Sequence, residues 1–314
     1  MKSRTLLLCL VVLVSACAQK NPSATTAIEN VTVIDPIDGT QAARRVLIAS
    51  GRILSVESMD VPRVSVSEVI DGKDRYLIPG LWDMHVHFLY DESLTDIMPG
   101  LFLDYGITSV RDTGGELDRM VSLRTRFQTS SEPEPNLYFS GPLLDGKFVV
   151  YDGGDPGRPK LGTGIPDAAT ARATVEHLKA AGANFIKIYE LIDPRVFESL
   201  AKAAADLNLP VAAHVPLMMT ADVAGPSTDS MEHLRNIELA CAHDWEARLV
   251  ARQSAISNFV EGRGYDLRRT LHSEQRLPAI ANYDEARCDS VLQTLRNVIQ
   301  VPTLRLNTVA TVLP

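Results

Sequence analysis

The pattern of strands and helices changes after Pro79-Gly80, and this change limits the folds open to the chain. Before it, short β-branched runs separated by Asp-Gly and Ser-Gly turns predict a small antiparallel sheet over residues 27–78. After it, short apolar runs alternate with helical segments, which is typical of parallel βα units. We therefore expect an α/β protein with a small N-terminal β module and a larger second part.

The second part, residues 79–314, contains seven candidate strands. They are 82–87, 107–112, 137–140, 185–189, 211–215, 230–233 and 301–306. Apolar residues recur at helical spacing between some of them, as in 167–181 and 194–207. A closed barrel needs about eight strands, each followed by a helix, and runs to about 250 residues. The predicted fold is therefore an incomplete (β/α)8 TIM-type barrel with about seven strands.

Residues 243–300 are too many for a simple connection between the sixth and seventh strands. Two segments in this stretch, 246–259 and 284–299, have helical patterns. We interpret the stretch as a helical insertion, placed where barrel enzymes build substrate specificity. An elaborated pair of crossover helices is the alternative.

The N-terminus has the features of an export signal. Lys2 and Arg4 precede an apolar run over 6–14, far shorter than the roughly 20 residues that cross a bilayer. The run ends in Val14-Ser15-Ala16-Cys17, which resembles a bacterial lipobox. This pattern predicts a signal peptide over 1–16, with an ordinary cleaved signal as the alternative.

In the lipobox interpretation, Cys17 is the lipid-modified first residue of the mature protein. Residues 17–26 are small and polar, which suits a flexible tether between the lipid and a folded domain. Ala18 stands where an Asp would signal retention in the inner membrane. We therefore expect a lipid-anchored protein of the bacterial cell envelope, on the periplasmic side of the outer membrane.

Charge and cysteine content limit the partners. Removal of residues 1–16 takes the basic count from 31 to 29 against 39 acidic residues, a net charge of about −10. We expect no nucleic-acid partner, since phosphate binding needs clustered Lys and Arg. Cys241 and Cys288 allow a single disulfide in an oxidising compartment but no disulfide scaffold.

The strongest chemical signal is a pair of histidines at the end of an apolar strand, His85 and His87. Side chains two residues apart in a strand point to the same face, so both imidazoles project toward the barrel interior. Two imidazoles there can bind one cation. A chance His-x-His is weak evidence, but the preceding Gly80-Leu81-Trp82-Asp83 makes this pattern specific.

On these residues the chain resembles the amidohydrolase superfamily, whose first barrel strand carries this pattern after a small β module. The resemblance runs from about Ala27 to the end of the chain and implies metal ligands at later strand ends. The candidates are Lys187, His214 and His233. Alternatives remain, since a strand-end lysine can reach out to water and a lone histidine is commonly structural.

The resemblance implies that His85 and His87 hold one metal ion, that His214 and His233 hold the other, and that carbamylated Lys187 bridges them. Burial favours the neutral lysine amine, which can react with carbon dioxide. Two zinc ions suit these ligands, and manganese, iron and cobalt are also compatible. The implied catalytic residues are Lys187 and His233, with a metal-activated water attacking an amide-like carbon.

One ligand implied by the resemblance is missing from the sequence. The family has an Asp at the end of the eighth strand, where it acts as proton shuttle, but none of the residues after Leu306 is acidic. We expect a C-terminally truncated chain or, alternatively, a shortened homologue that pairs with a second polypeptide. Loss of a proton shuttle costs about 10²- to 10⁴-fold in rate, so we expect reduced activity.

The segments Phe-Ile-Lys-Ile-Tyr, Ala-His-Val-Pro and Glu-His-Leu-Arg-Asn resemble the branch with imidazolonepropionase and the prolidase-like dipeptidases. This resemblance implies a small-molecule substrate such as a dipeptide or N-acyl amino acid. Tyr189, Arg235 and His243 lie near strand ends as candidate substrate-binding residues, with surface or packing roles as alternatives. The competing function is a non-catalytic envelope binding lipoprotein, or an inactive fragment, that keeps a degenerate barrel.

Overall fold

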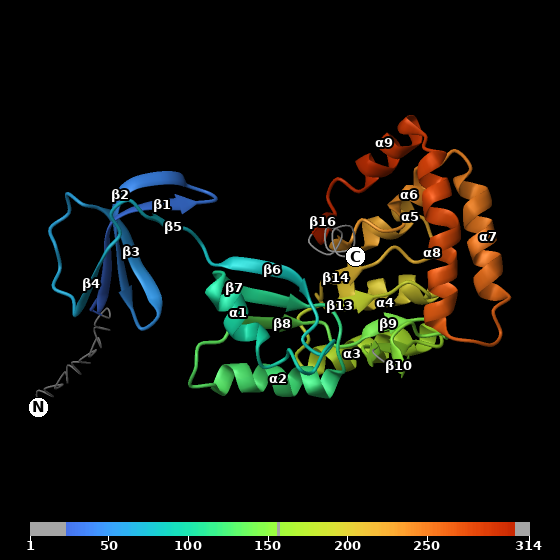
Figure 1. Cartoon of the computed structure of the whole chain (residues 1–314), viewed down its shortest axis with the longest axis horizontal. Coiled ribbons are helices and arrows are strands. Elements are labelled where there is room, and N and C mark those ends of the chain that lie inside the picture. The colour runs from blue at the N-terminus through green and yellow to red at the C-terminus, as the bar shows by residue number, and fades with distance from the viewer. Residues whose placement is uncertain (1–22, 156–157, 305–314) are drawn as a thin grey trace, which may run out of the picture. The chain divides into compact units, whose positions relative to one another are not determined.

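The structure is a computed structural model that describes residues 23–155 and 158–304. The chain divides after Pro79 into two compact units (Figure 1). The signal peptide and Cys17 lie outside the described residues, so export and lipidation stay predictions. No helix in the described ranges has the length and apolar character that crossing a membrane requires.

The first unit is a five-stranded sheet in which β1 is central. Its strands are β1 (Thr26–Asp35), β2 (Gly39–Ala49), β3 (Arg52–Ser58), β4 (Glu68–Asp71) and β5 (Tyr76–Leu77). Tight turns join β1 to β2 and β2 to β3, and these pairs are antiparallel. β4 and β5 pair parallel to β1, so the expectation of an antiparallel sheet is wrong. The reason is the longer connection after β3, which brings the chain back to the free edge of β1 in the same direction.

The second unit contains parallel strands in two sheets. The first sheet has the order β6 (Leu81–Val86), β7 (Ile107–Asp112), β8 (Asn136–Phe139). The second has the order β12 (Gly162–Gly164), β9 (Leu143–Asp145), β13 (Ile186–Ile188), β14 (Val211–Ala213), β15 (Ser230–Glu232), β16 (Ile299–Val301). β10 (Asp152–Asp155) and β11 (Arg158–Lys160) pair antiparallel in a separate two-stranded sheet.

The two sheets adjoin at β8 and β9. No helix separates these strands, and the Asn184 N–H before β13 donates to the Phe139 carbonyl at the end of β8 (2.9 Å). Arg111 on β7 contacts Ser230 and Glu232 on β15 (3.0 and 2.6 Å). Strands of the two sheets therefore face each other across an interior, which shows that the array curves. Within the described strands, β6 is an edge strand of the first sheet and β16 an edge strand of the second, and the two do not pair with each other.

Helices cover the parallel strands on the outside (Figure 1). They are α1 (Met98–Asp104), α2 (Leu117–Thr129), α3 (Ala168–Ala180), α4 (Pro194–Asp206), α5 (Ala221–Ala224), a 3-10 turn (Gly225–Ser227), α6 (Ile237–Ala240), α7 (Trp245–Ser257), α8 (Gly264–Ala281) and α9 (Glu285–Thr294). α4 shows why such segments fold. Asp193 caps its first turn by accepting from the Arg195 N–H (2.8 Å), and Phe197 and Leu200 are buried in the core. Each such side chain stabilises the fold by about 1.5–3 kcal/mol.

The predicted helices over 167–181, 194–207 and 246–259 are confirmed within two residues at their ends. The strand predicted over 301–306 is wrong in position, since β16 ends at Val301. Pro302 has no N–H for a ladder hydrogen bond, which explains the end. Helix α8 was not predicted, because its buried face includes Arg268 and its interior includes Pro278.

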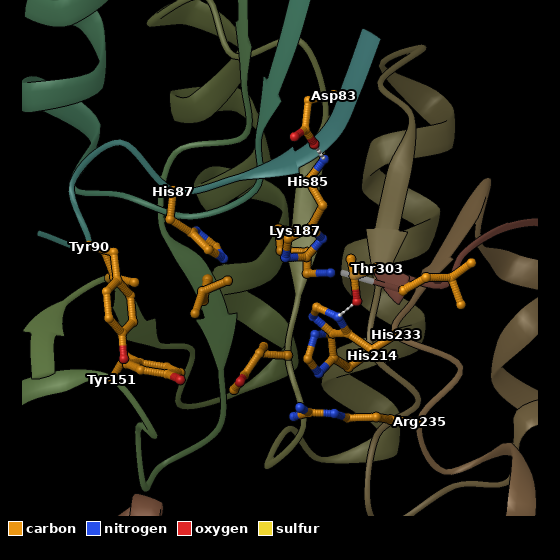
Figure 2. Close-up of a pocket in the computed structure, with 14 residues that line it drawn as sticks. Asp83, His85, His87, Tyr90, Tyr151, Lys187, His214, His233, Arg235 and Thr303 are labelled. Carbon is orange, nitrogen blue, oxygen red and sulfur yellow. Dashed lines mark hydrogen bonds between the residues drawn. The ribbon is translucent and has the colours of Figure 1, made fainter. Parts of the chain in front are cut away.

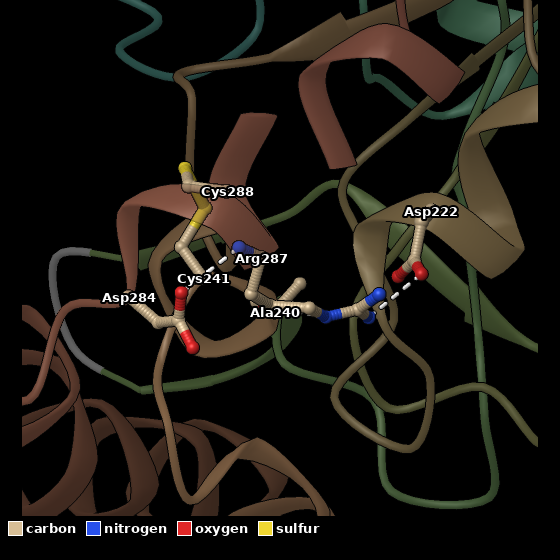
Figure 3. Close-up of a disulfide and its surroundings, with 6 residues drawn as sticks. All are labelled: Asp222, Ala240, Cys241, Asp284, Arg287 and Cys288. Carbon is tan, nitrogen blue, oxygen red and sulfur yellow. Dashed lines mark hydrogen bonds and ion pairs between the residues drawn. A yellow bond between two sulfur atoms is a disulfide. The ribbon is translucent and has the colours of Figure 1, made fainter. Parts of the chain in front are cut away.

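A disulfide joins the two ends of the segment that contains α7 and α8 (Figure 3). Cys241 follows α6 and Cys288 lies on α9, with a sequence separation of 47 residues. Beside it, Arg287 pairs with Asp222 on α5 (2.7 Å) and donates to the Ala240 carbonyl (3.0 Å). The helical excursion is therefore held to the rest of the unit by covalent and ionic links.

Replacing both Cys241 and Cys288 with Ser is expected to lower the free energy of unfolding by about 4 kcal/mol, from the entropy of opening a loop of this length. Urea denaturation of the two proteins measures the difference. Reductant should lower the midpoint of the wild type and leave the double variant unchanged. A wild type whose midpoint does not move after complete reduction would contradict the expectation.

Candidate active site

His87 is oriented by the loops that follow β6 and β7. Buried Asp112, at the end of β7, accepts from the N–H groups of Phe88 (2.7 Å) and Gly114 (3.0 Å), which fixes both loops. Burial raises the pKa of Asp112 to about 7. The Gly114 carbonyl then accepts from His87 Nδ1 (3.1 Å). A Cβ at Gly114 would lie 2.8 Å from Leu143 Cδ2 and 3.1 Å from His87 Cε1, so a larger residue would require these side chains to shift.

His85, on β6, is oriented by a carboxylate from the second sheet. Its Nδ1 lies 2.7 Å from Oε2 of Glu232, the last residue of β15. Glu232 Oε1 accepts from Arg111 (2.6 Å) and lies 4.0 Å from Lys187 Nζ. Burial raises the pKa of Glu232, but its cationic and hydrogen-bonding neighbours outweigh burial and lower it overall.

His214 follows β14 and is bonded to a buried carboxylate. Its Nδ1 lies 2.6 Å from Oε1 of Glu190, which is fully buried just after β13. Helix α8 supplies two more partners for Glu190, Arg268 Nη2 (2.9 Å) and His272 Nε2 (2.5 Å). Burial raises the pKa of this carboxyl, but these two α8 side chains reverse the shift and hold the pKa well below its usual range.

His233 follows β15 and starts a turn with unusual backbone angles. Its φ of 65°, like the 55° of Leu234 and the 64° of Asn236, is left-handed. Asn236 anchors the turn by donating to the Val215 carbonyl (3.0 Å). His233 Nδ1 lies 2.6 Å from the Thr303 hydroxyl, as Figure 2 shows.

The four imidazoles meet at one place. Ring centroids lie 5.1 Å apart for His85 and His87, 4.4 Å for His85 and His233, and 4.8 Å for His214 and His233. Burial lowers the pKa of each of these histidines, for His87 to about 3, so all are neutral at pH 7. The Nδ1 atoms of His85, His87 and His214 face carboxylate or carbonyl oxygens and so carry the proton, which leaves the Nε2 lone pair of these three histidines for a ligand.

Lys187, the middle residue of β13, completes this cluster (Figure 2). It is fully buried, and its Nζ has no hydrogen-bond partner within residues 23–155 and 158–304. Burial lowers its pKa to about 8, which makes the neutral amine accessible. Among the described residues, no three side chains from His, Cys, Asp and Glu are grouped to hold a cation by themselves. A metal ion bound here would therefore need a ligand atom in addition to the imidazole nitrogens.

The cluster lines a cavity of about 650 Å³ at the ends of the parallel strands. The lining residues are Asp83, His85, His87, Tyr90, Leu143, Tyr151, Leu161, Lys187, Tyr189, His214, His233, Arg235, Thr303 and Leu304. Of the candidate substrate-binding residues, Tyr189 and Arg235 are in this wall. His243 is not: its side chain is 66% exposed and pairs with Asp284 (2.9 Å) at the base of the helical excursion.

Comparison with known proteins gives the fold a context. No family model matches the chain. A dihydroorotase from Anaeromyxobacter dehalogenans (strain 2CP-C) is 39% identical over 61 residues, which are 19% of this chain and 14% of that protein. A solved Xaa-Pro dipeptidase with methionine bound in its active site has a TM-score of 0.59 at 19% identity, over 88% of this chain and 79% of that chain.

Two further solved structures are similar over most of the chain. A molinate hydrolase has a TM-score of 0.58 at 19% identity, over 82% of this chain and 72% of that chain. The ochratoxinase of A. niger has a TM-score of 0.55 at 19% identity, over 91% of this chain and 79% of that chain. These proteins are amidohydrolase-superfamily members. The chain has the amidohydrolase fold. The resemblance that His85 and His87 indicated is thus confirmed at the level of the fold.

Sequence reasoning missed the groups that orient the histidines of this amidohydrolase fold. They are Asp112, Glu190, Glu232, Arg268, His272 and Thr303. A signal for the carboxylates was available, since all three stand at or just beyond the ends of parallel strands. Arg268 and His272 had no comparable signal, because α8 itself was not predicted.

Replacing Arg268 with Met is expected to lower the free energy of unfolding by about 3 kcal/mol, because Glu190 would lose its main counter-ion while staying buried. Urea denaturation measures this loss. Arg269→Met is the matched control, because Arg269 is the exposed neighbour on the same helix and should change stability by less than about 0.5 kcal/mol. Equal losses in the two variants would show that the Glu190 pair is not what stabilises this region.

Proposed function

We propose that this chain is a metal-dependent hydrolase that cleaves carbon–nitrogen bonds in amide-like small molecules such as dipeptides or N-acyl amino acids. One observation carries the proposal: neutral imidazoles from three strand ends, each bonded to the protein through Nδ1, surround the buried amine of Lys187. The amidohydrolase fold, shared with a dipeptidase and a molinate hydrolase, supports this chemistry. We further propose that the curved parallel array is part of a TIM-type barrel, which a crystal structure would test.

The donor set fits a pair of divalent cations, with zinc the best match for imidazole. His85 and His87 would hold one ion, and His214 and His233 the other. Lys187 would hold both ions, because its Nζ makes no hydrogen bond within the described residues and its neutral form can add to carbon dioxide and lose a proton, which would give a carbamate with two ligand oxygens. Such ions, when bound, lower the pKa of water toward ~7 and polarise a carbonyl oxygen.

The protein's own groups prepare the site for this chemistry. Glu190 and Glu232 accept from Nδ1 of His214 and His85, which keeps each Nε2 free to bind a cation. Tyr189 packs against the His214 ring, with centroids 4.5 Å apart, and limits its rotation. We propose His233 and Lys187 as the residues nearest the reacting carbon, because both line the cavity at its centre.

The wild-type chain, dialysed against zinc, is expected to retain about two zinc ions and to release amine from a panel of dipeptides and N-acyl amino acids. The double variant His85→Ala, His87→Ala should lose at least one ion and its turnover. His243→Ala is the matched control, because this histidine lies outside the cavity. Elemental analysis and amine release measure the two effects. Ligand binding without zinc or turnover in the wild type would favour the non-catalytic binding protein instead.

The carbamate is tested separately. After incubation with zinc and ¹³C-bicarbonate, the wild type should give one slowly exchanging carbamate signal by NMR. Lys187→Met should abolish it, because the signal requires this amine. Lys202→Met, at an exposed position on α4, should leave it unchanged. A signal that persists in Lys187→Met would remove Lys187 from the proposed metal site.

A further inference from the structure

Arg235 differs from the other arginines around the cavity in having no carboxylate partner in the part of the chain that the structure describes. Arg111 is paired with Glu232, and Arg268 is paired with Glu190. Arg235 lines the same cavity and is half-buried, but it forms no ion pair with any residue in the described ranges. A cation held at a cavity wall without a counter-ion is suited to an anionic group of a ligand.

The backbone that presents Arg235 is strained. His233 and Leu234 precede it and Asn236 follows it, all with left-handed φ angles. Such angles are unfavourable for non-glycine residues and persist only where surrounding contacts enforce them. Asn236 supplies that enforcement, because its side chain bonds the Val215 carbonyl (3.0 Å) and buried Arg252 on α7 (3.3 Å). The turn therefore fixes Arg235 beside His233 on one wall of the cavity (Figure 2).

The rest of the cavity wall is mostly apolar or aromatic. Tyr90 and Tyr151 have ring centroids 6.3 Å apart, and Leu143 and Leu161 lie in the same lining. Asp83 is the acidic residue of the lining, and its Oδ1 accepts from the backbone N–H of His85 (3.0 Å). A ligand thus meets a cation at Arg235, an apolar surface at the tyrosines on another side of the cavity, and the histidine cluster along the wall next to Arg235 (Figure 2).

We propose that Arg235 binds the carboxylate of the substrate, while the apolar group on the other side of its amide lies against Tyr90 and Tyr151. A planar guanidinium donates two parallel hydrogen bonds to a carboxylate, which fixes the orientation of the ligand as well as its charge. The substrate class is then an amino acid acylated by an apolar group, with its carboxylate free. This assignment rests on the proposed function, which places the scissile amide at the histidine cluster.

The test compares two probes that differ at one group, N-benzoylglycine and its neutral amide, N-benzoylglycinamide. Calorimetry is done on the full chain with a chelator present, so that no carboxylate contact with a metal contributes. The wild type should bind the acid about tenfold or more tightly than the amide. Arg235→Gln should reduce this ratio to about twofold or less. Arg195→Gln, at a position where the side chain is 87% exposed, should keep the wild-type ratio.

Arg235→Lys repeats the test in case the Gln variant does not fold, which far-UV circular dichroism will show. Lysine keeps the charge but loses the paired hydrogen bonds, so the ratio should fall at least about threefold. The proposal is overturned if the wild type fails to bind the acid, if it binds both probes equally, or if its preference persists in the Arg235 variants. Loss of preference without any turnover by the zinc-loaded wild type would instead leave the Arg235 site standing and remove the proposed hydrolase function.

Discussion

The site depends on carboxylates that are buried beside imidazoles. Glu190 and Glu232 are both almost fully buried, and such ions are costly unless charged and hydrogen-bonding neighbours offset the lost hydration. Each is offset by an arginine from another element and by a histidine of the cluster. In return, each carboxylate sets which nitrogen of its histidine carries the proton. Carboxylates behind the cavity wall therefore determine which nitrogen atoms of these histidines are free to accept a hydrogen bond or bind a cation.

Helix α8 takes part in this second layer, which changes how the helical excursion is understood. The excursion was expected to cover the rim of a barrel, where loops select substrates. Arg268 and His272 on this helix reach inward and share the carboxylate that orients His214. α7 contributes in the same way through Arg252, which supports the turn that carries His233. The excursion therefore holds two of the four histidines in place.

The sequence was sufficient to predict the cavity-facing histidines and Lys187 as one cluster, because parallel strands bring their carboxyl ends to one edge. It could not reveal the partners of these residues, since contacts such as Arg111 with Glu232 depend on how the array curves. Hydrophobic patterns also gave wrong or missing predictions where a single residue opposes the structure that its neighbours favour. Pro302 ends β16 early, and buried Arg268 hides the apolar face of α8. His243 stands near a predicted strand end, yet the chain has already turned away from the cavity there.

The segment between the two half-cystines leaves and re-enters the fold at almost the same point. Its ends are 4.3 Å apart at the Cα atoms, and backbone bonds from His243 to Asn282 (2.9 Å) and from Asp284 to Cys241 (2.9 Å) close the neck. The disulfide and these backbone hydrogen bonds fix the positions of residues 241–243 and 282–288. The segment between them can therefore change in length without moving β15 or β16. A segment of another length or sequence can accordingly replace this one, provided that it still supplies a cation to Glu190 and a hydrogen-bond donor to Asn236.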